Sequence, residues 1–148
     1  MTEEAVTKAL LVWLTARGWE ILCYDFPQSG TGYLLHPDGV AGEKNRGGVI
    51  PDIVAVKGER AAFFENKNRF VLEDFEKQYR MIDKNPYAAA VDRLLAGQGI
   101  RRVWYGIGLP RAAWGARAEH AAALVDFVLA VGPNGGVAAV HNPAKIPF

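Results

Sequence analysis

The sequence predicts an α/β protein in which a mixed β-sheet is flanked by α-helices. Three observations indicate this class. A helical pattern opens the chain, strand-like runs follow it, and helical patterns then precede a further strand. The strand-like runs Ile53–Val56 and Ala61–Lys67, separated by the short polar turn at residues 57–60, have the form of an antiparallel hairpin. The run from Arg102 to Leu109 is apolar enough to lie buried between two layers. This order is typical of one sheet covered by helices.

The first element is expected to be a helix. Thr2 can act as its N-cap, acidic residues occupy the first turn, and Gly18 follows Arg17 as a stop signal. One apolar stripe recurs at helical spacing, formed by Val6, Leu10, Trp13 and Leu14.

The rest of the chain divides by the same signals. The Gly- and Pro-rich text from Pro27 to Gly48 predicts a long loop, with a short extended piece at Gly32–Leu35. The expected strands are Trp19–Phe26, Ile53–Val56, Ala61–Lys67, Arg102–Leu109, and a second hairpin of Phe127–Val131 and Gly136–Val140. The expected helices are Leu72–Asp83 with Leu72, Phe75, Tyr79 and Ile82 on one face, a second from the N-cap signal Asn85-Pro86 to near Gly97, and Ala116–Leu124.

Composition is that of an ordinary globular chain. Of the 148 residues, 50% are hydrophobic and 22% charged, which suits one domain over 1–148. The apolar stretch Ala9–Leu14 is too short to span a bilayer, and Glu3 and Glu4 stand where a secretory signal would be basic. A single cysteine, Cys23, excludes an internal disulfide and suggests a reducing compartment. We therefore expect a cytoplasmic protein without membrane contact.

Charge alone does not suggest nucleic acid. The net charge is +1, whereas dedicated DNA binders are often strongly basic. The distribution is nevertheless uneven, and local basic patches can form. Candidate nucleic-acid contacts are Lys44 and Arg46 beside a glycine-rich loop, and Arg101 and Arg102 in a stretch without acidic residues.

Three residues stand out once the first hairpin is drawn. Asp52 sits at the mouth of the first strand, directly after Pro51. Glu65 and Lys67 are two apart on the second strand, so their side chains leave the same face. A carboxylate at one strand's entry can thus meet a carboxylate and an amine near the end of its partner. The plain alternative is an Asp that only begins a strand and an exposed Glu–Lys pair.

This trio suits phosphodiester hydrolysis. Two carboxylates and the backbone carbonyl of Asn66 offer hard oxygen ligands for Mg²⁺, with Mn²⁺ as a substitute. Such an ion polarises a phosphate and lowers the pKa of a bound water. Lys67 could orient that water or stabilise the developing charge.

Here the sequence resembles the PD-(D/E)xK nuclease superfamily. The matching text is Pro51-Asp52, twelve residues, then Glu65-Asn66-Lys67, placed on two strands joined by a short turn. The resemblance implies a restriction-endonuclease-like core and a metal-dependent DNA endonuclease. It also implies that Asp52 and Glu65 bind the metal and that Lys67 assists catalysis. Many members add a metal-ligating glutamate on the first helix, which Glu3 would match; the alternative for Glu3 is an exposed acid in a frayed first turn.

Residues after the motif are less specific. Gln78 could reach a phosphate from the helix that follows the lysine strand, while Lys77 and Arg80 are expected on a solvated helix face. The restriction-type interpretation predicts a minimal enzyme acting as a homodimer, or a catalytic subunit that needs a recognition subunit. The alternatives are a structure-selective junction or repair nuclease, a non-catalytic nucleic-acid-binding module with the same fold, and an unrelated α/β protein that carries the motif by chance.

Overall fold

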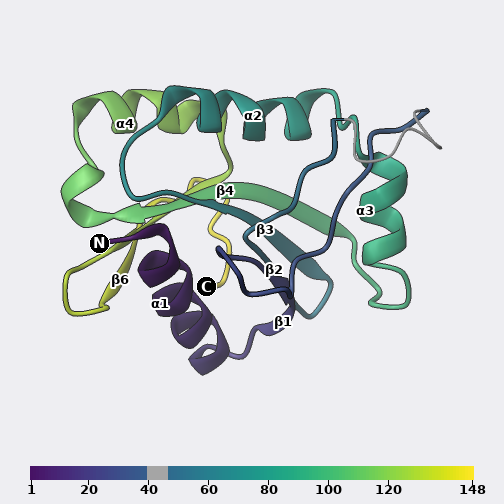
Figure 1. The fold of residues 1–148 in the computed structure, drawn as a ribbon, viewed down its shortest axis with the longest axis horizontal. Coiled ribbons are helices and arrows are strands. Elements are labelled where there is room, and N and C mark those ends of the chain that lie inside the picture. Colours follow the sequence, from purple (N-terminus) through teal and green to yellow (C-terminus); the bar gives the residue numbers. More distant parts are fainter. Residues whose placement is uncertain (40–46) are drawn as a thin grey trace.

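Six strands form one mixed sheet in the computed structural model, which describes residues 1–39 and 47–148 (Figure 1). The strands occur in the sheet in the same order as in the chain. Their bounds are β1 Glu20–Tyr24, β2 Ile53–Lys57, β3 Arg60–Asn66, β4 Arg102–Pro110, β5 Phe127–Val131 and β6 Val137–His141. The helices are α1 Glu3–Ala16, α2 Leu72–Asp83, α3 Ala88–Leu94 and α4 Ala116–Ala121, with 3₁₀ turns at Arg111–Ala113 and Ala122–Leu124. The prediction of a mixed sheet flanked by helices is confirmed.

The sheet changes from antiparallel to parallel at its centre. β1, β2 and β3 form an antiparallel meander, β3 to β5 run parallel, and β6 returns antiparallel to β5. Each parallel connection needs a crossover, and these crossovers carry α2 with α3 and then α4. β4 therefore lies inside the sheet, which explains its apolar sequence.

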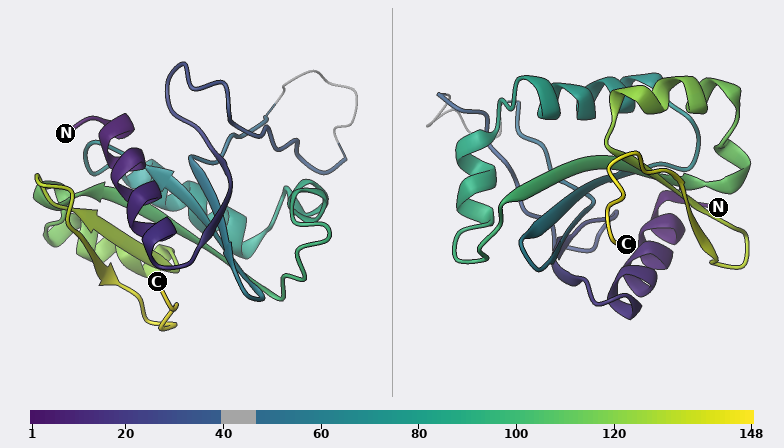
Figure 2. Two further views of the ribbon diagram at one scale, coloured as in Figure 1. Left: turned by 90° about the horizontal axis from the view of Figure 1, so that it is seen from below. Right: turned by 180° about the vertical axis from the view of Figure 1, so that it is seen from behind.

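The helices lie on both faces of the sheet. α1 crosses one face, and α2 and α4 lie along the other (Figures 1 and 2). Successive side chains of β3 point to opposite faces of the sheet. Phe64 belongs to the core cluster under α1, and Phe63 belongs to the cluster that includes residues of α2 and α3. This alternation decides which helix each site residue meets.

Most predicted elements are confirmed. The Thr2 hydroxyl accepts a hydrogen bond from the Ala5 N–H at 3.0 Å, so it caps α1 as expected. Gly18 follows the helix at φ 85°, a left-handed conformation that suits glycine. Both hairpins form, and α2 has the predicted bounds. The extended piece expected at Gly32–Leu35 contributes only an isolated bridge between Leu35 and Val49.

Two expectations about the helices are wrong. α2 buries Phe75, Gln78 and Met81, whereas Leu72, Tyr79 and Ile82 are exposed. Asn85 does not cap the next helix, which starts three residues later with Tyr87 in the N-cap position. Asn85 instead adopts φ 46°, and the carboxylate of Asp38 accepts a hydrogen bond from the Ala89 N–H in the first turn of α3.

Two features bear on the expected environment. Within the described residues, no helix is long and apolar enough to cross a membrane. Cys23 lies half-buried in β1 as a free thiol, and its burial raises the pKa of that thiol to about 11. It is therefore a packing residue and not a reactive nucleophile.

Candidate active site

The predicted catalytic residues meet where β2 begins and β3 ends. Ile53 pairs with Phe64, so the next positions along the two strands are Asp52 and Glu65. The Asp52 N–H donates to the Phe64 carbonyl at 2.9 Å, and the carboxylate of Asp52 accepts from the Asn66 N–H at 2.6 Å. The side chain of Asp52 thus continues the hydrogen bonding of β3 beyond the start of β2, which fixes its carboxylate beside Glu65.

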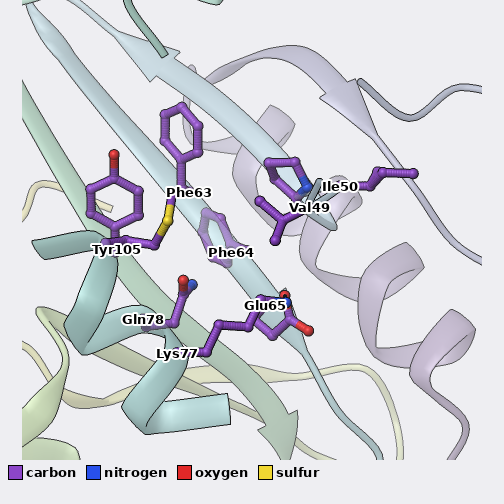
Figure 3. Close-up of a pocket in the computed structure, with 10 residues that line it drawn as sticks. Val49, Ile50, Phe63, Phe64, Glu65, Lys77, Gln78 and Tyr105 are labelled. Atoms are coloured by element: carbon purple, nitrogen blue, oxygen red, sulfur yellow. Dashed lines mark hydrogen bonds and ion pairs between the residues drawn. The ribbon is translucent and has the colours of Figure 1, made fainter. Parts of the chain in front are cut away.

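Two lysines hold the carboxylate of Glu65. Lys67 Nζ lies 3.2 Å from Oε1, and Lys77 Nζ lies 3.1 Å from Oε2. Lys67 follows the last residue of β3, whereas the side chain of Lys77 extends from α2 toward Glu65, as the close-up in Figure 3 shows. The Glu65 side chain is only 10% exposed, so both ion pairs are largely shielded from solvent.

Two further acids surround Lys67. Its ammonium lies 3.8 Å from Oε1 of Glu3 on α1 and 3.9 Å from Oδ1 of Asp74 on α2. Lys67 therefore lies near carboxylates from the strand β3 and from two helices, α1 and α2, which lie on opposite faces of the sheet. Glu3 does come to the site, although its side chain is 43% exposed and its role as a metal ligand stays a prediction.

Three groups of the site, Asp52, Asp74 and Lys67, have raised pKa values. Burial and the charge of Glu65 raise the pKa of Asp52 to about 7, against the opposing effects of the Asn66 N–H and the two lysines. Burial likewise raises the pKa of Asp74. Burial alone would lower the pKa of Lys67, but the carboxylates of Glu65, Asp74 and Glu3 outweigh it and raise that pKa. Lys67 is thus held as an ammonium ion.

A buried contact fixes α1 against the site. Asn66 points to the opposite face from Glu65, and its amide donates to the Thr7 hydroxyl at 3.0 Å. Gly108 on β4 leaves the room for this side chain, because a Cβ there would lie only 2.3 Å from Asn66 Oδ1. The middle residue of Glu65-Asn66-Lys67 therefore joins α1 to β3 and sets the position of Glu3.

The carboxylates of the site suit a magnesium ion that keeps part of its water shell, and not a metal held entirely by protein side chains. Across residues 1–39 and 47–148, no group of three or more His, Cys, Asp or Glu side chains is arranged to hold a metal. Mg²⁺, however, is commonly bound through one or two carboxylates and keeps several waters. Asp52 and Glu65 are two carboxylates at adjoining positions of the paired strands, so their chemistry fits such an ion.

Of the candidate nucleic-acid contacts, Gln78 lines the same pocket as Glu65 and Lys77 (Figure 3), whereas Arg101 and Arg102 lie elsewhere. Gln78 is buried and donates to the Gly106 carbonyl at 2.9 Å, and this pocket, of about 20 Å³, is large enough for about one water molecule. Arg102 pairs with Arg60 at the start of β3, five residues before Glu65, and Arg101 is next to it. These two arginines are therefore at the other end of the strand, roughly 17 Å away. Lys44 and Arg46 fall outside the described residues.

Two site residues on α2 were not predicted from the sequence. Lys77 was expected on a solvated face, but it is paired with Glu65, and Asp74 was not considered. One signal was available. Asp74, Lys77, Gln78 and Met81 follow the spacing i, i+3, i+4, i+7, which places them on one side of the helix. That side includes the buried Met81, so it faces the sheet.

No family model, no curated protein and no solved structure matches this chain. The functional assignment therefore depends on the geometry of the site and on the chemistry of its residues.

Proposed function

We propose that the chain is a Mg²⁺-dependent DNA endonuclease with a restriction-endonuclease-like core, in which Mn²⁺ can replace Mg²⁺. One observation carries the proposal. Asp52, Glu65 and Lys67, which form the pattern of the PD-(D/E)xK superfamily, converge at one strand end, with Lys67 3.2 Å from Glu65 and Asp52 fixed on the Asn66 N–H. An accidental match to the pattern would not require the three side chains to converge.

Each residue has a distinct chemical task in this proposal. Asp52 and Glu65 would hold the metal ion, together with the Asn66 carbonyl and, from α1, Glu3. When bound, the ion would polarise the phosphate and lower the pKa of a bound water. Lys67 keeps its proton beside three carboxylates, so it can orient the attacking water and stabilise negative charge on the phosphate.

The partner in this proposal is duplex DNA, cut by a restriction-type enzyme. One chain carries one such site, and two cuts in a duplex need two sites, so we expect a homodimer or a complex with a recognition subunit.

Plasmid cleavage tests the proposal. Supercoiled plasmid is incubated with the protein and Mg²⁺, Mn²⁺ or EDTA, beside Lys67→Ala and the control Lys84→Ala. Lys84 is a suitable control because its side chain is 79% exposed and it contacts only Asp83 among the ion pairs of the described residues. We expect metal-dependent nicking or linearisation that Lys67→Ala loses and Lys84→Ala keeps. Cleavage retained by Lys67→Ala would contradict the assigned site.

Metal titration separates an enzyme from a binding module with the same fold. The nuclease should bind Mg²⁺ or Mn²⁺ with an affinity that Asp52→Ala abolishes. A non-catalytic module would bind DNA without any metal affinity that depends on Asp52.

A further inference from the structure

Lys77 forms a second ion pair with Glu65, a carboxylate that already pairs with Lys67. Its ammonium takes Oε2 of Glu65, the oxygen that Lys67 leaves open. Lys67 alone already pairs with this carboxylate, and α2 is anchored independently by Phe75, Gln78 and Met81, which are buried. The second ion pair therefore has another consequence, which is that both oxygens of a proposed metal ligand are covered by cations.

The charge of the cluster is unbalanced in this arrangement. Glu3, Asp52, Glu65 and Asp74 supply four carboxyl groups, and Lys67 and Lys77 supply two ammonium groups. With all groups ionised the formal charge of the cluster is −2. A divalent cation would bring the formal charge to zero with both lysines in place, and to −1 once Lys77 has left Glu65.

Lys77 is more exposed than the carboxylate with which it pairs. Its side chain is 32% exposed, whereas that of Glu65 is 10% exposed. The lysine stem is long and flexible and carries a compact charge, which suits binding to a phosphate oxygen. The carboxylate is held by the strand, so the lysine is the partner that can leave.

We propose that Lys77 is an exchangeable cation: it neutralises Glu65 while no metal ion is bound, and it binds a backbone phosphate of the DNA once a metal ion has taken the carboxylate. This inference rests on the proposed nuclease function, and it adds a substrate-binding residue from α2 to that site. It also makes Lys77 a competitor of the metal for Glu65.

The test combines ion binding with DNA binding in Lys77→Gln, Lys77→Arg and the matched control Lys84→Gln. Mn²⁺ affinity is measured without DNA by electron paramagnetic resonance. Removing the competing charge in Lys77→Gln should tighten Mn²⁺ binding on the order of tenfold. Lys84→Gln should bind Mn²⁺ as the unmodified chain does. Thermal melting of each variant checks that it is folded.

Binding of a short duplex is then measured over a range of salt concentrations, in Ca²⁺ and in EDTA. In Ca²⁺, the plot of log affinity against log salt concentration should become shallower for Lys77→Gln, with the magnitude of its negative slope smaller by about one, because one phosphate contact is lost. Lys77→Arg should keep the original slope. In EDTA the slopes of the unmodified chain and Lys77→Gln should be equal, since Glu65 then holds the lysine.

Three results would overturn the exchange. Mn²⁺ affinity that is unchanged or weaker in Lys77→Gln would show that Lys77 does not compete for Glu65. A slope that changes equally in Ca²⁺ and in EDTA, or does not change in Ca²⁺, would remove the proposed phosphate contact. Absence of Mn²⁺ binding by the unmodified chain would overturn the nuclease proposal itself, and the exchange with it, so the two failures are distinguishable.

Discussion

At the scale of single residues, Asp52 has two tasks that oppose each other. Its carboxylate accepts the Asn66 N–H and so completes the hydrogen bonding at the end of β3. It does so beside Glu65 and away from solvent, which raises its pKa to about 7. An ionised carboxyl group here destabilises the metal-free fold, because the folded chain binds the proton more tightly than the unfolded chain does.

This shift predicts a pH dependence of stability. In EDTA, the free energy of unfolding should fall as pH rises from about 4 to 7, since folded Asp52 keeps a proton that the unfolded chain has lost. The contribution is at most about 4 kcal/mol, at 1.36 kcal/mol for each unit of pKa. Urea denaturation at pH 4 and pH 7.5 measures it. Asp52→Asn keeps an acceptor for the Asn66 N–H and should lose this part of the pH dependence; an unchanged difference between the two pH values would refute the assignment.

At the scale of elements, α2 shows which properties of a helix its periodic sequence pattern can predict. Its bounds were predicted because they depend on local signals, but its buried face was not. A stripe through Leu72 and Tyr79 and a stripe through Gln78 and Met81 both have helical spacing, with Phe75 common to both. The structure selects the second, because Gln78 donates to the Gly106 carbonyl on β4. That acceptor lies far along the chain, so the spacing of Gln78 and Met81 alone cannot show which of the two stripes is buried.

The two stripes make different predictions for truncation. Phe75 is 1% exposed and packs with Phe70, so Phe75→Ala should destabilise the fold by about 3–5 kcal/mol. Leu72 is 41% exposed, so Leu72→Ala should cost less than about 1 kcal/mol. Urea denaturation compares the two variants. Equal losses would mean that α2 is packed by the face first expected from the sequence.

The difference between local signals and contacts with distant elements also explains which site residues could be predicted from the sequence. Asp52, Glu65 and Lys67 could be predicted together because one hairpin, with a short turn, brings them to the same strand end. Glu3 was recognised because the family resemblance implies a metal-ligating glutamate on the first helix. Asp74 and Lys77 were missed because their partners are on another element. Arg101 and Arg102 were chosen from local charge, which contains no information about the end of the sheet where they lie.

At the scale of the whole molecule, the proposal places a single catalytic centre in a 16.2 kDa chain. If a homodimer cuts both strands of DNA, two chains should sediment together at twice that mass. Supercoiled plasmid should become linear without a build-up of nicked circles, because both cuts are made in one encounter. Analytical ultracentrifugation and a cleavage time course measure these two properties. A monomer that accumulates nicked circles would contradict the homodimer and favour a separate partner subunit.

The parallel pairing of β3 with β4 also has a consequence for the order of folding. The backbone N–H of Lys67 donates to the Gly108 carbonyl, so this lysine is fixed only when β4 has docked. The β2–β3 hairpin is local and can close early, whereas β4 must wait for the crossover through α2 and α3 to form. Glu3 lies at the far end of the chain from these strands and is joined through Thr7 and Asn66. During refolding, the β2–β3 hairpin that brings Asp52 beside Glu65 should therefore form before Lys67 is fixed, so under the proposed function cleavage should return only after β4 has docked.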